Sequence, residues 1–186
     1  LYDNEVYGLT KGQAGPTLGL GEKPKSLPRP NPQGKVNPLL LAFASGYTWI
    51  ARGYAYDVKG LKELIKEGIA HRGLAFLHVL QPCPTYNDLH TKEWFAPRLY
   101  RLEEEGYDPL VPPGLPPEAL EARMARFQQK ALEWGERIPV GVFWKAELPT
   151  FEARLKAYLP RYPEAYPARG PETPLDLEGL LQEFAL

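Results

Sequence analysis

Apolar and charged residues alternate with a helical period after Asp57. The apolar positions of this segment are Leu61, Leu64, Ile65 and Ile69, with lysine and glutamate between them. This spacing predicts an amphipathic helix that has Asp57 as its N-cap and ends at residues 71–73. The following residues 74–80 (LAFLHVL) are nearly all apolar, which predicts a strand covered on both faces, as in a parallel sheet. A helix followed by a buried strand is typical of an α/β fold.

Three further segments carry ordered patterns. Residues 39–52 (LLLAFASGYTWIAR) predict a buried segment followed by a strand, and residues 138–144 (IPVGVFW) predict another strand. Pro116 and Pro117 open a predicted helix with one apolar face. That face comprises Leu120, Met124, Phe127, Ala131 and Leu132. At the start of the chain, Leu1 and Tyr2 are expected to end a strand that leads into a turn.

Proline- and glycine-rich segments separate these elements. The sequence contains 21 prolines and 17 glycines among 186 residues, which predicts long irregular stretches. Residues 14–38 are too rich in both to form a long helix or a central strand, and a loop of this length is usually functional or mobile. Residues 160–174 predict an extended tail, followed by a short helix that Asp176 caps. The predicted organisation is one domain over residues 1–159 and a tail over residues 160–186.

Composition and charge exclude several classes of protein. Hydrophobic residues make up 44% and charged residues 24% of the chain, and the net charge is −1. These values predict a globular chain and no nucleic-acid partner, which would require a basic stripe. No apolar run approaches the roughly 20 residues that span a bilayer, so we expect no membrane partner and a cytoplasmic location. Because the chain starts at Leu1 and its only methionine is Met124, we expect it to be a piece of something longer.

The single cysteine, Cys83, follows the predicted buried strand directly. It lies in the string QPCPTYN, residues 81–87, and loops at the carboxyl ends of parallel strands form the ligand crevice of open α/β sheets. The flanking prolines stiffen the loop and would hold a thiolate at a fixed point. A free thiol, a nucleophile and a metal ligand all stay open at this stage. A nucleophile needs a neighbouring base, which no motif supplies, and a metal site needs partner thiolates from elsewhere.

The segment after Asp3 offers oxygen ligands for a hard cation. The side-chain carbonyl of Asn4 and the main-chain carbonyl two residues on can bind one Mg²⁺, which is often shared with a diphosphate. Residues 8–13 (GLTKGQ) add a hydroxyl, an amide and an ammonium and could wrap a phosphate or carboxylate. Their spacing is not that of a Walker motif, and an ordinary surface turn is the alternative. His78 is expected to be a hydrogen-bonded core residue, and His71 and His90 are expected to have no direct chemical role.

Two strings together resemble a known family. Residues 3–13 (DNEVYGLTKGQ), followed by Pro16-Thr17, and residues 80–87 (LQPCPTYN) closely resemble the β subunit of 2-oxoacid:ferredoxin oxidoreductases. The resemblance continues at Gly53 and Asp57, returns at residues 137–143, and so covers roughly residues 1–150. It implies that residues 1–159 are the C-terminal portion of a thiamine diphosphate-binding domain, with a mostly parallel sheet flanked by helices.

The resemblance implies an oxidative decarboxylation. The family uses thiamine diphosphate, Mg²⁺ and a 4Fe-4S cluster to convert a 2-oxoacid and coenzyme A to acyl-CoA and CO₂, with electrons passed to ferredoxin. It also implies an α subunit as a partner, and this chain alone is expected to be inactive.

The resemblance assigns a cofactor role to one run of residues. Asn4 would give its side-chain oxygen to Mg²⁺, and Val6 would give its main-chain carbonyl. Tyr7, Gly8 and Leu9 would complete the cofactor-binding segment.

The remaining roles concern the substrate and the cluster. Leu9 would also line the pocket beside the substrate side chain, and Thr10 and Lys11 would be catalytic residues near the substrate or the acyl acceptor. Cys83 would be the last of four thiolate ligands to the 4Fe-4S cluster.

The sequence also departs from the family pattern. It contains neither the GDG motif, whose aspartate supplies another Mg²⁺ ligand, nor the three further cysteines of the cluster. Gly15 stands where many relatives have serine. Two alternatives therefore stay open: a thiamine diphosphate decarboxylase without redox chemistry, and a non-catalytic assembly module of the same fold.

Overall fold

The computed structural model describes residues 1–159, together with Tyr162 and Gln182. The chain divides into two compact units, Leu1–Leu148 and Pro149–Leu186. In the second unit the structure describes one helix, α5 (Phe151–Tyr158), whose N-cap Thr150 accepts a hydrogen bond from the Ala153 amide. The predicted extended tail and the helix capped by Asp176 lie outside the described residues, and the domain boundary at residue 159 stays a prediction.

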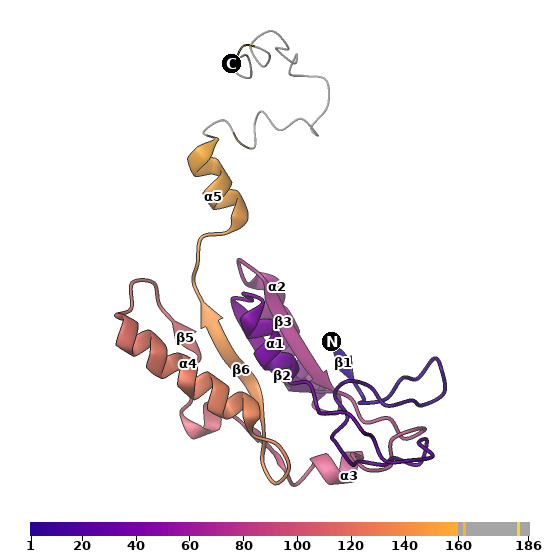
Figure 1. Ribbon diagram of the computed structural model, residues 1–186. Coiled ribbons are helices and arrows are strands. Elements are labelled where there is room, and N and C mark those ends of the chain that lie inside the picture. Colours follow the sequence, from indigo (N-terminus) through magenta and orange to yellow (C-terminus); the bar gives the residue numbers. More distant parts are fainter. Residues whose placement is uncertain (160–161, 163–181, 183–186) are drawn as a thin grey trace. The chain divides into compact units, whose positions relative to one another are not determined.

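The first unit is an α/β structure (Figure 1). Its helical segments are α1 (Pro38–Ala44), α2 (Val58–Ala70), α3 (Lys92–Phe95), η1 (Glu103–Glu105) and α4 (Pro117–Leu132). Its strands are β1 (Tyr2–Asp3), β2 (Trp49–Tyr54), β3 (Ala75–Leu80), β4 (Leu99–Arg101), β5 (Leu110–Val111) and β6 (Ile138–Ala146). None of the helices in the part of the chain that the structure describes has the length and hydropathy that crossing a membrane would require.

The sheet is mostly parallel, as the sequence predicts. Within the described residues it has six strands in the order β1-β3-β2-β6-β4, and β5 pairs with β6. Among the strand pairs of the described residues, only β2–β6 is antiparallel. The register sets Tyr2 beside Val79 and Asp3 beside Leu80, so β1 and β3 end at the same edge of the sheet. The loops that follow these two strands therefore start side by side.

Helices cover both faces of the sheet. Because successive side chains of a strand point to opposite faces, each strand packs against helices on both sides. On one face of β2, the Trp49 ring lies against Gly68 of α2. On the other face, Ile50 is fully buried and belongs to a core cluster that includes Leu39 of α1 and Phe127 of α4. This arrangement confirms the predicted sheet flanked by helices.

Local sequence signals explain where the helices begin. Asp57 caps α2 by accepting a hydrogen bond from the Gly60 amide at 3.0 Å, and α4 begins at Pro117, both as predicted. The buried segment predicted after residue 38 is a helix. Asn37 caps it by accepting bonds from the amides of Leu39 and Leu40, and Pro38 occupies its first turn. The predicted strand of residues 74–80 forms β3, although only its second half is buried.

Candidate functional site

The Asn4 side chain folds back onto the main chain directly after β1. Its Oδ1 accepts a hydrogen bond from the Val6 amide at 3.0 Å, which closes a tight turn over residues 4–6. Glu5 occupies the centre of this turn with a φ of 66°, in the left-handed region that is costly for a residue with a side chain. The surrounding contacts must therefore hold the turn in place.

Main-chain pairing places two oxygen donors on one side of this turn. Val6 faces Ala14 in an isolated antiparallel bridge, and the bonds run between their neighbours: the Gly15 amide donates to Glu5 O, and the Tyr7 amide donates to Gln13 O, both at 2.8 Å. In such a pair the N–H and C=O of Val6 point away from Ala14. Because the Val6 amide meets Asn4 Oδ1, the Val6 carbonyl lies on the Asn4 side as well. Two amide-type oxygens on one side fit a hard cation such as Mg²⁺.

Gly15 belongs to the same paired segment. A Cβ atom added there would lie 2.9 Å from the Glu5 carbonyl oxygen, so a serine at this position would require a shift of the backbone. The glycine therefore allows the close approach of the two paired segments around Val6 and Ala14.

The loop of residues 7–13 is closed by its own hydrogen bonds. The Gly12 amide donates to Tyr7 O at 2.7 Å, and the Thr10 hydroxyl donates to Gln13. Lys11 has a φ of 78°, which again is a left-handed conformation of a non-glycine residue. The Leu9 side chain is 96% exposed, and Thr10 and Lys11 are also exposed. The loop thus presents these side chains to solvent, where a ligand or a partner chain can meet them.

The Asp3 carboxylate stabilises the turn of residues 4–6 through hydrogen bonds. Its Oδ1 accepts bonds from the Glu5 amide at 3.0 Å and the Thr17 hydroxyl at 2.6 Å, and its Oδ2 lies 2.8 Å from His78 Nε2. Burial raises the pKa of Asp3, but the hydrogen bond with His78 and those from the Thr17 hydroxyl and the Glu5 amide outweigh it and hold the pKa below its usual range. An ionised carboxylate therefore lies beneath the proposed magnesium ligands.

His78 is a hydrogen-bonded core residue, as predicted. Arg52 Nε donates to His78 Nδ1 at 3.3 Å, and a guanidinium is always a donor. The His78 ring is therefore neutral, with its proton on Nε2, facing Asp3. Burial lowers the pKa of His78, and the Arg52 charge lowers it further.

The Glu5 side chain is buried in a second polar cluster. Lys35 Nζ lies 3.1 Å from Oε1 and also lies 3.3 Å from the centre of the Trp134 ring, a cation–π contact. The other carboxylate oxygen accepts a bond from Asn87 Nδ2 at 3.2 Å and contacts His90 Nδ1. Burial lowers the pKa of Lys35, while the Glu5 carboxylate opposes that shift.

Cys83 lies in the loop that follows β3, beside the turn of residues 4–6. Its thiol is free and half-buried. The Asn87 amide donates to the Cys83 carbonyl at 3.0 Å, and Lys25 Nζ donates to the carbonyl of Pro84 at 2.9 Å. The long loop that precedes α1, residues 14–37, therefore braces the cysteine loop. It also reaches the loop of residues 7–13, where the Ser26 hydroxyl donates to Gly12 O at 2.7 Å.

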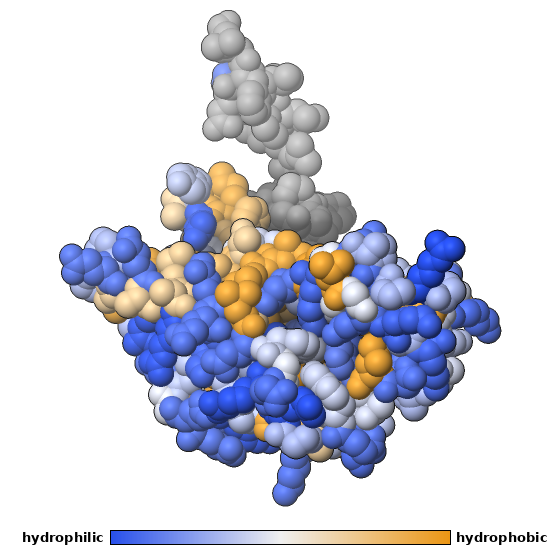
Figure 2. All heavy atoms as spheres, turned by 60° about the horizontal axis from the view of Figure 1, so that its bottom comes forward, coloured by the Kyte–Doolittle hydropathy of each residue, from blue (hydrophilic) through white to orange (hydrophobic). Residues whose placement is uncertain are grey.

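The structure thus brings the predicted residues to one edge of the sheet, where the loops after β1 and β3 gather (Figure 1). The surface on this side is largely hydrophilic, with separated apolar areas (Figure 2). Sequence reasoning missed three buried residues of the site: Glu5, Asn87 and His90. Glu5 and Asn87 stand inside the two recognised strings, which was the available signal, whereas nothing in the sequence pairs His90 with Glu5.

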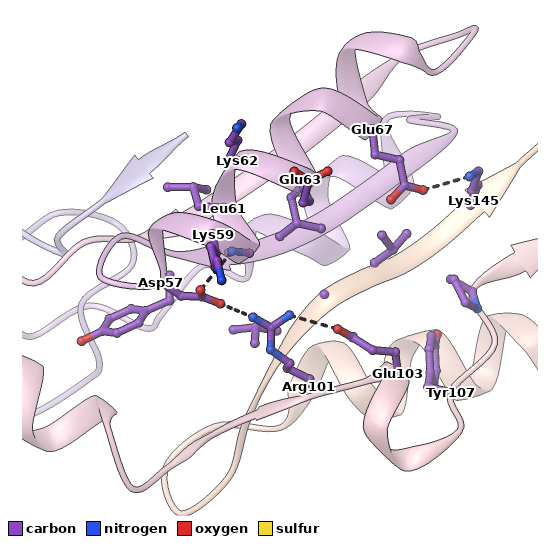
Figure 3. Close-up of a pocket in the computed structure, with 18 of the residues that line it drawn as sticks. Asp57, Lys59, Leu61, Lys62, Glu63, Glu67, Arg101, Glu103, Tyr107 and Lys145 are labelled. Carbon is purple, nitrogen blue, oxygen red and sulfur yellow. Dashed lines mark hydrogen bonds and ion pairs between the residues drawn. The ribbon is translucent and has the colours of Figure 1, made fainter.

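A separate cavity of about 800 Å³ lies between α2, the β4–η1 segment and β6 (Figure 3). The lining contains four cationic and four anionic side chains, some of them paired: Arg101 contacts Asp57 and Glu103, and Lys145 lies 2.8 Å from Glu67. None of the residues predicted to bind cofactor, substrate or cluster lines it. Because cations and anions balance there, the cavity shows no preference for a phosphate or a carboxylate.

Two family models match the chain in succession. Residues 1–79 match the C-terminal TPP-binding domain of thiamine pyrophosphate enzymes, and residues 83–159 match the C-terminal region of the pyruvate ferredoxin oxidoreductase β subunit.

Individual proteins agree with these models. The β subunit of a 2-oxoacid:ferredoxin oxidoreductase from Sulfolobus sp is 58% identical over 171 residues, covering 91% of this chain and 55% of that protein. The corresponding β subunit of Saccharolobus solfataricus is 50% identical over 192 residues, covering 98% and 61%. Among solved structures, the 2-oxoglutarate:ferredoxin oxidoreductase from Magnetococcus marinus, with 2-oxoglutarate, coenzyme A and succinyl-CoA bound, matches with a TM-score of 0.72 at 27% identity. That match covers 100% of this chain and 57% of the other.

The sheet and the solved neighbour define the class of fold: this is an α/β chain, and its residues 1–79 match the model of the C-terminal domain of thiamine pyrophosphate enzymes. Within that class, the chain is a relative of the β subunits of 2-oxoacid:ferredoxin oxidoreductases, and the resemblance predicted from the sequence is confirmed. The chain spans only 55% and 61% of the length of the two β subunits named above.

Proposed function

We propose that this chain acts within the β subunit of a 2-oxoacid:ferredoxin oxidoreductase. The reaction converts a 2-oxoacid, coenzyme A and oxidised ferredoxin to acyl-CoA, CO₂ and reduced ferredoxin. The observation that carries the proposal is the parallel pairing of β1 with β3. This pairing brings the turn of residues 4–6 and the Cys83 loop, which carry the two recognised strings, to the same edge of the sheet.

Thiamine diphosphate, when bound, would supply the nucleophilic carbon for the decarboxylation. The residues of this chain hold and orient the reactants. Asn4 Oδ1 and the Val6 carbonyl would hold the Mg²⁺ of the diphosphate, and Tyr7 and Gly8 would complete the cofactor-binding segment.

The exposed loop meets the substrate and the acyl acceptor. The apolar side chain of Leu9 borders the side chain of the 2-oxoacid. The Lys11 ammonium binds a carboxylate or a phosphate, and the Thr10 hydroxyl donates a hydrogen bond beside it. Because Leu9 is almost fully exposed, the opposite wall of this pocket comes from an α subunit, which we propose as the partner.

Cys83 provides one thiolate to a 4Fe-4S cluster, and the chemistry of its donor atom suits that role. The sequence contains one cysteine, so in this proposal the other three ligands come from outside it. Ferredoxin would be the electron acceptor. A cytoplasmic location stays a prediction.

The replacement Cys83→Ser in the full β subunit, produced with its α subunit, tests the assignment. We expect loss of iron and of ferredoxin reduction, with binding of thiamine diphosphate retained, because only the cluster loses a ligand. Thr85→Ala, an exposed change in the same loop, is the matched control and should keep the iron. Full electron transfer in the Cys83→Ser protein would contradict the proposal.

The same preparations separate the two alternatives. A decarboxylase without redox chemistry would release CO₂ with no iron in the wild-type complex. An assembly module would bind neither thiamine diphosphate nor iron.

A further inference from the structure

Both polar atoms of the Asn87 side chain and its main-chain amide are hydrogen-bonded. Its side-chain Nδ2 donates to the Asn4 carbonyl and to Glu5 Oε2, both at 3.2 Å. Its Oδ1 accepts from the amides of Leu89 at 3.1 Å and His90 at 3.3 Å. Its main-chain amide donates to the Cys83 carbonyl at 3.0 Å. Asn87 is only 2% exposed, so water does not compete for these bonds.

These contacts fix one orientation of the side-chain amide. The oxygen faces two N–H donors and the nitrogen faces two oxygen acceptors, so a flipped amide would oppose like groups on both sides. The amide is planar and short. It therefore satisfies all these bonds only when the loop that contains Cys83 lies in one position relative to the turn that contains Asn4. A buried polar network that is fully satisfied in this way is rigid and specific.

We propose that Asn87 is a positioning residue that locks the Cys83 loop to the turn of residues 4–6, and so fixes the proposed cluster ligand relative to the proposed magnesium ligands. The inference rests on the proposed function for the meaning of those ligands. The lock itself is a property of this chain. The lock would set the distance between the cofactor at the proposed magnesium ligands and the cluster at Cys83. This distance matters because the rate of electron transfer falls steeply as the separation of two centres grows.

Glu5 forms the other half of the lock. Its side chain is buried, and one carboxylate oxygen meets Asn87 while the other meets Lys35. Replacing the Asn87 amide nitrogen by an oxygen would set two acceptors against each other at this point. The bonds that Oδ1 accepts from Leu89 and His90 would survive, and so would the contact of His90 with Glu5. The variant Asn87→Asp therefore removes the link that Asn87 makes and leaves the rest of the cysteine loop held.

The test uses the full β subunit with its α subunit, as wild type, Asn87→Asp and the control Asn31→Ala. Asn31 is also buried, and its Nδ2 donates to the carbonyls of Leu18, Gly19 and Gln33, but it touches neither the Asn4 turn nor the Cys83 loop. We expect Asn87→Asp to bind Mg²⁺ roughly tenfold more weakly in the presence of thiamine diphosphate, measured by calorimetry. We also expect a changed electron paramagnetic resonance spectrum of the reduced cluster at unchanged iron content.

Amide hydrogen exchange gives a readout that needs no cofactor. Exchange should become faster in both segments, residues 4–7 and 83–90, in Asn87→Asp and in neither segment in Asn31→Ala. Adding Glu5→Gln to Asn87→Asp restores a donor opposite the new carboxylate, and we expect it to recover part of the protection. Equal effects of Asn87→Asp and Asn31→Ala on Mg²⁺ affinity, spectrum and exchange would overturn the proposal. Should Cys83→Ser keep its iron, the proposed function would fail while the exchange result would still decide whether the lock exists.

Discussion

His78 Nε2 lies 2.8 Å from Asp3 Oδ2, while Arg52 donates to the other ring nitrogen at 3.3 Å. A neutral imidazole thus separates a buried carboxylate from a buried guanidinium. Because Asp3 directly precedes Asn4 and also accepts the Glu5 amide, this chain of contacts supports the turn that carries the proposed magnesium ligands. Its strength depends on pH, because protonation of His78 would add a second cation beside Arg52.

We expect the free energy of unfolding to fall as the pH drops below about 6.5, the ordinary pKa of histidine. The pKa of His78 is lowered in the folded chain, first by burial and then by Arg52. The unfolded chain therefore takes up a proton at a higher pH than the folded chain, and stability rises with pH across that interval, with a slope of up to about 1.4 kcal/mol per pH unit. The pKa of Asp3 is also lowered, so its contribution is lost only in more acidic solution, as the pH falls through its folded value.

The variant His78→Gln isolates this effect. A glutamine offers one donor for Asp3 and one acceptor for Arg52 but no titration, so urea unfolding between about pH 5 and pH 7 should show a flatter dependence than in the wild type. His71→Gln is the control, since His71 also has a lowered pKa but is only half-buried at the end of α2. An unchanged slope in His78→Gln would show that another group causes the pH dependence.

Local signals in the sequence were sufficient to predict most elements of the fold. The N-cap Asp57 and the prolines before α4 act within one turn of the helices that they start, and the apolar run of β3 marks a strand by itself. The apolar run that begins at residue 39 was predicted only as a buried segment, because a short apolar run fits a helix or a strand equally well. The N-cap hydrogen bonds of Asn37 favour the helix over a strand.

The candidate site was predicted less completely, for a physical reason. Asn4, Val6 and Cys83 were found through strings whose chemistry is local. The contacts that hold them in place join residues far apart in the sequence: Glu5 meets Asn87 across 82 positions and His90 across 85. Such pairs depend on the register of β1 against β3, which no periodicity within a single segment reveals.

We expect the charge of Lys11 to affect substrate binding and its backbone conformation to affect the stability of the chain. The variants Lys11→Ala and Lys11→Gly separate these two effects. In the full complex, both Lys11→Ala and Lys11→Gly should raise the KM for the 2-oxoacid or coenzyme A, or lower kcat, by roughly tenfold or more. A hydrogen bond to a charged group contributes about 1.5–3 kcal/mol. The two variants differ in stability, because the φ of 78° at this position favours glycine over any residue with a Cβ.

We therefore expect Lys11→Gly to unfold at an equal or higher urea concentration than Lys11→Ala. The relief of the left-handed strain, about 1–2 kcal/mol, exceeds the cost of about 0.5–1 kcal/mol that the flexibility of glycine adds. Lys23→Ala, an exposed lysine on the adjoining long loop, is the kinetic control. Steady-state constants that match the wild type in both Lys11 variants would remove this side chain from the site.

Asp57 stabilises α2 mainly as an N-cap, even though it also pairs with Arg101 at the mouth of the separate cavity (Figure 3). The Asp57 and Arg101 side chains are 37% and 39% exposed, and ion pairs at such positions contribute little. The cap bond to the Gly60 amide satisfies a main-chain donor that the helix cannot satisfy itself. We thus expect Asp57→Ala to lower the free energy of unfolding by about 1 kcal/mol.

The replacement Asp57→Asn distinguishes the cap from the ion pair, because asparagine caps a helix as well as aspartate but carries no charge. It should change the free energy of unfolding by less than about 0.5 kcal/mol in urea titrations with an unchanged slope. Arg101→Met, which keeps the aliphatic stem and removes the guanidinium, should behave in the same way. If Asp57→Asn lowered stability as much as Asp57→Ala, the ion pair with Arg101 would be the stabilising contact. The start of α2 would then depend on the β4 segment and not on its own cap.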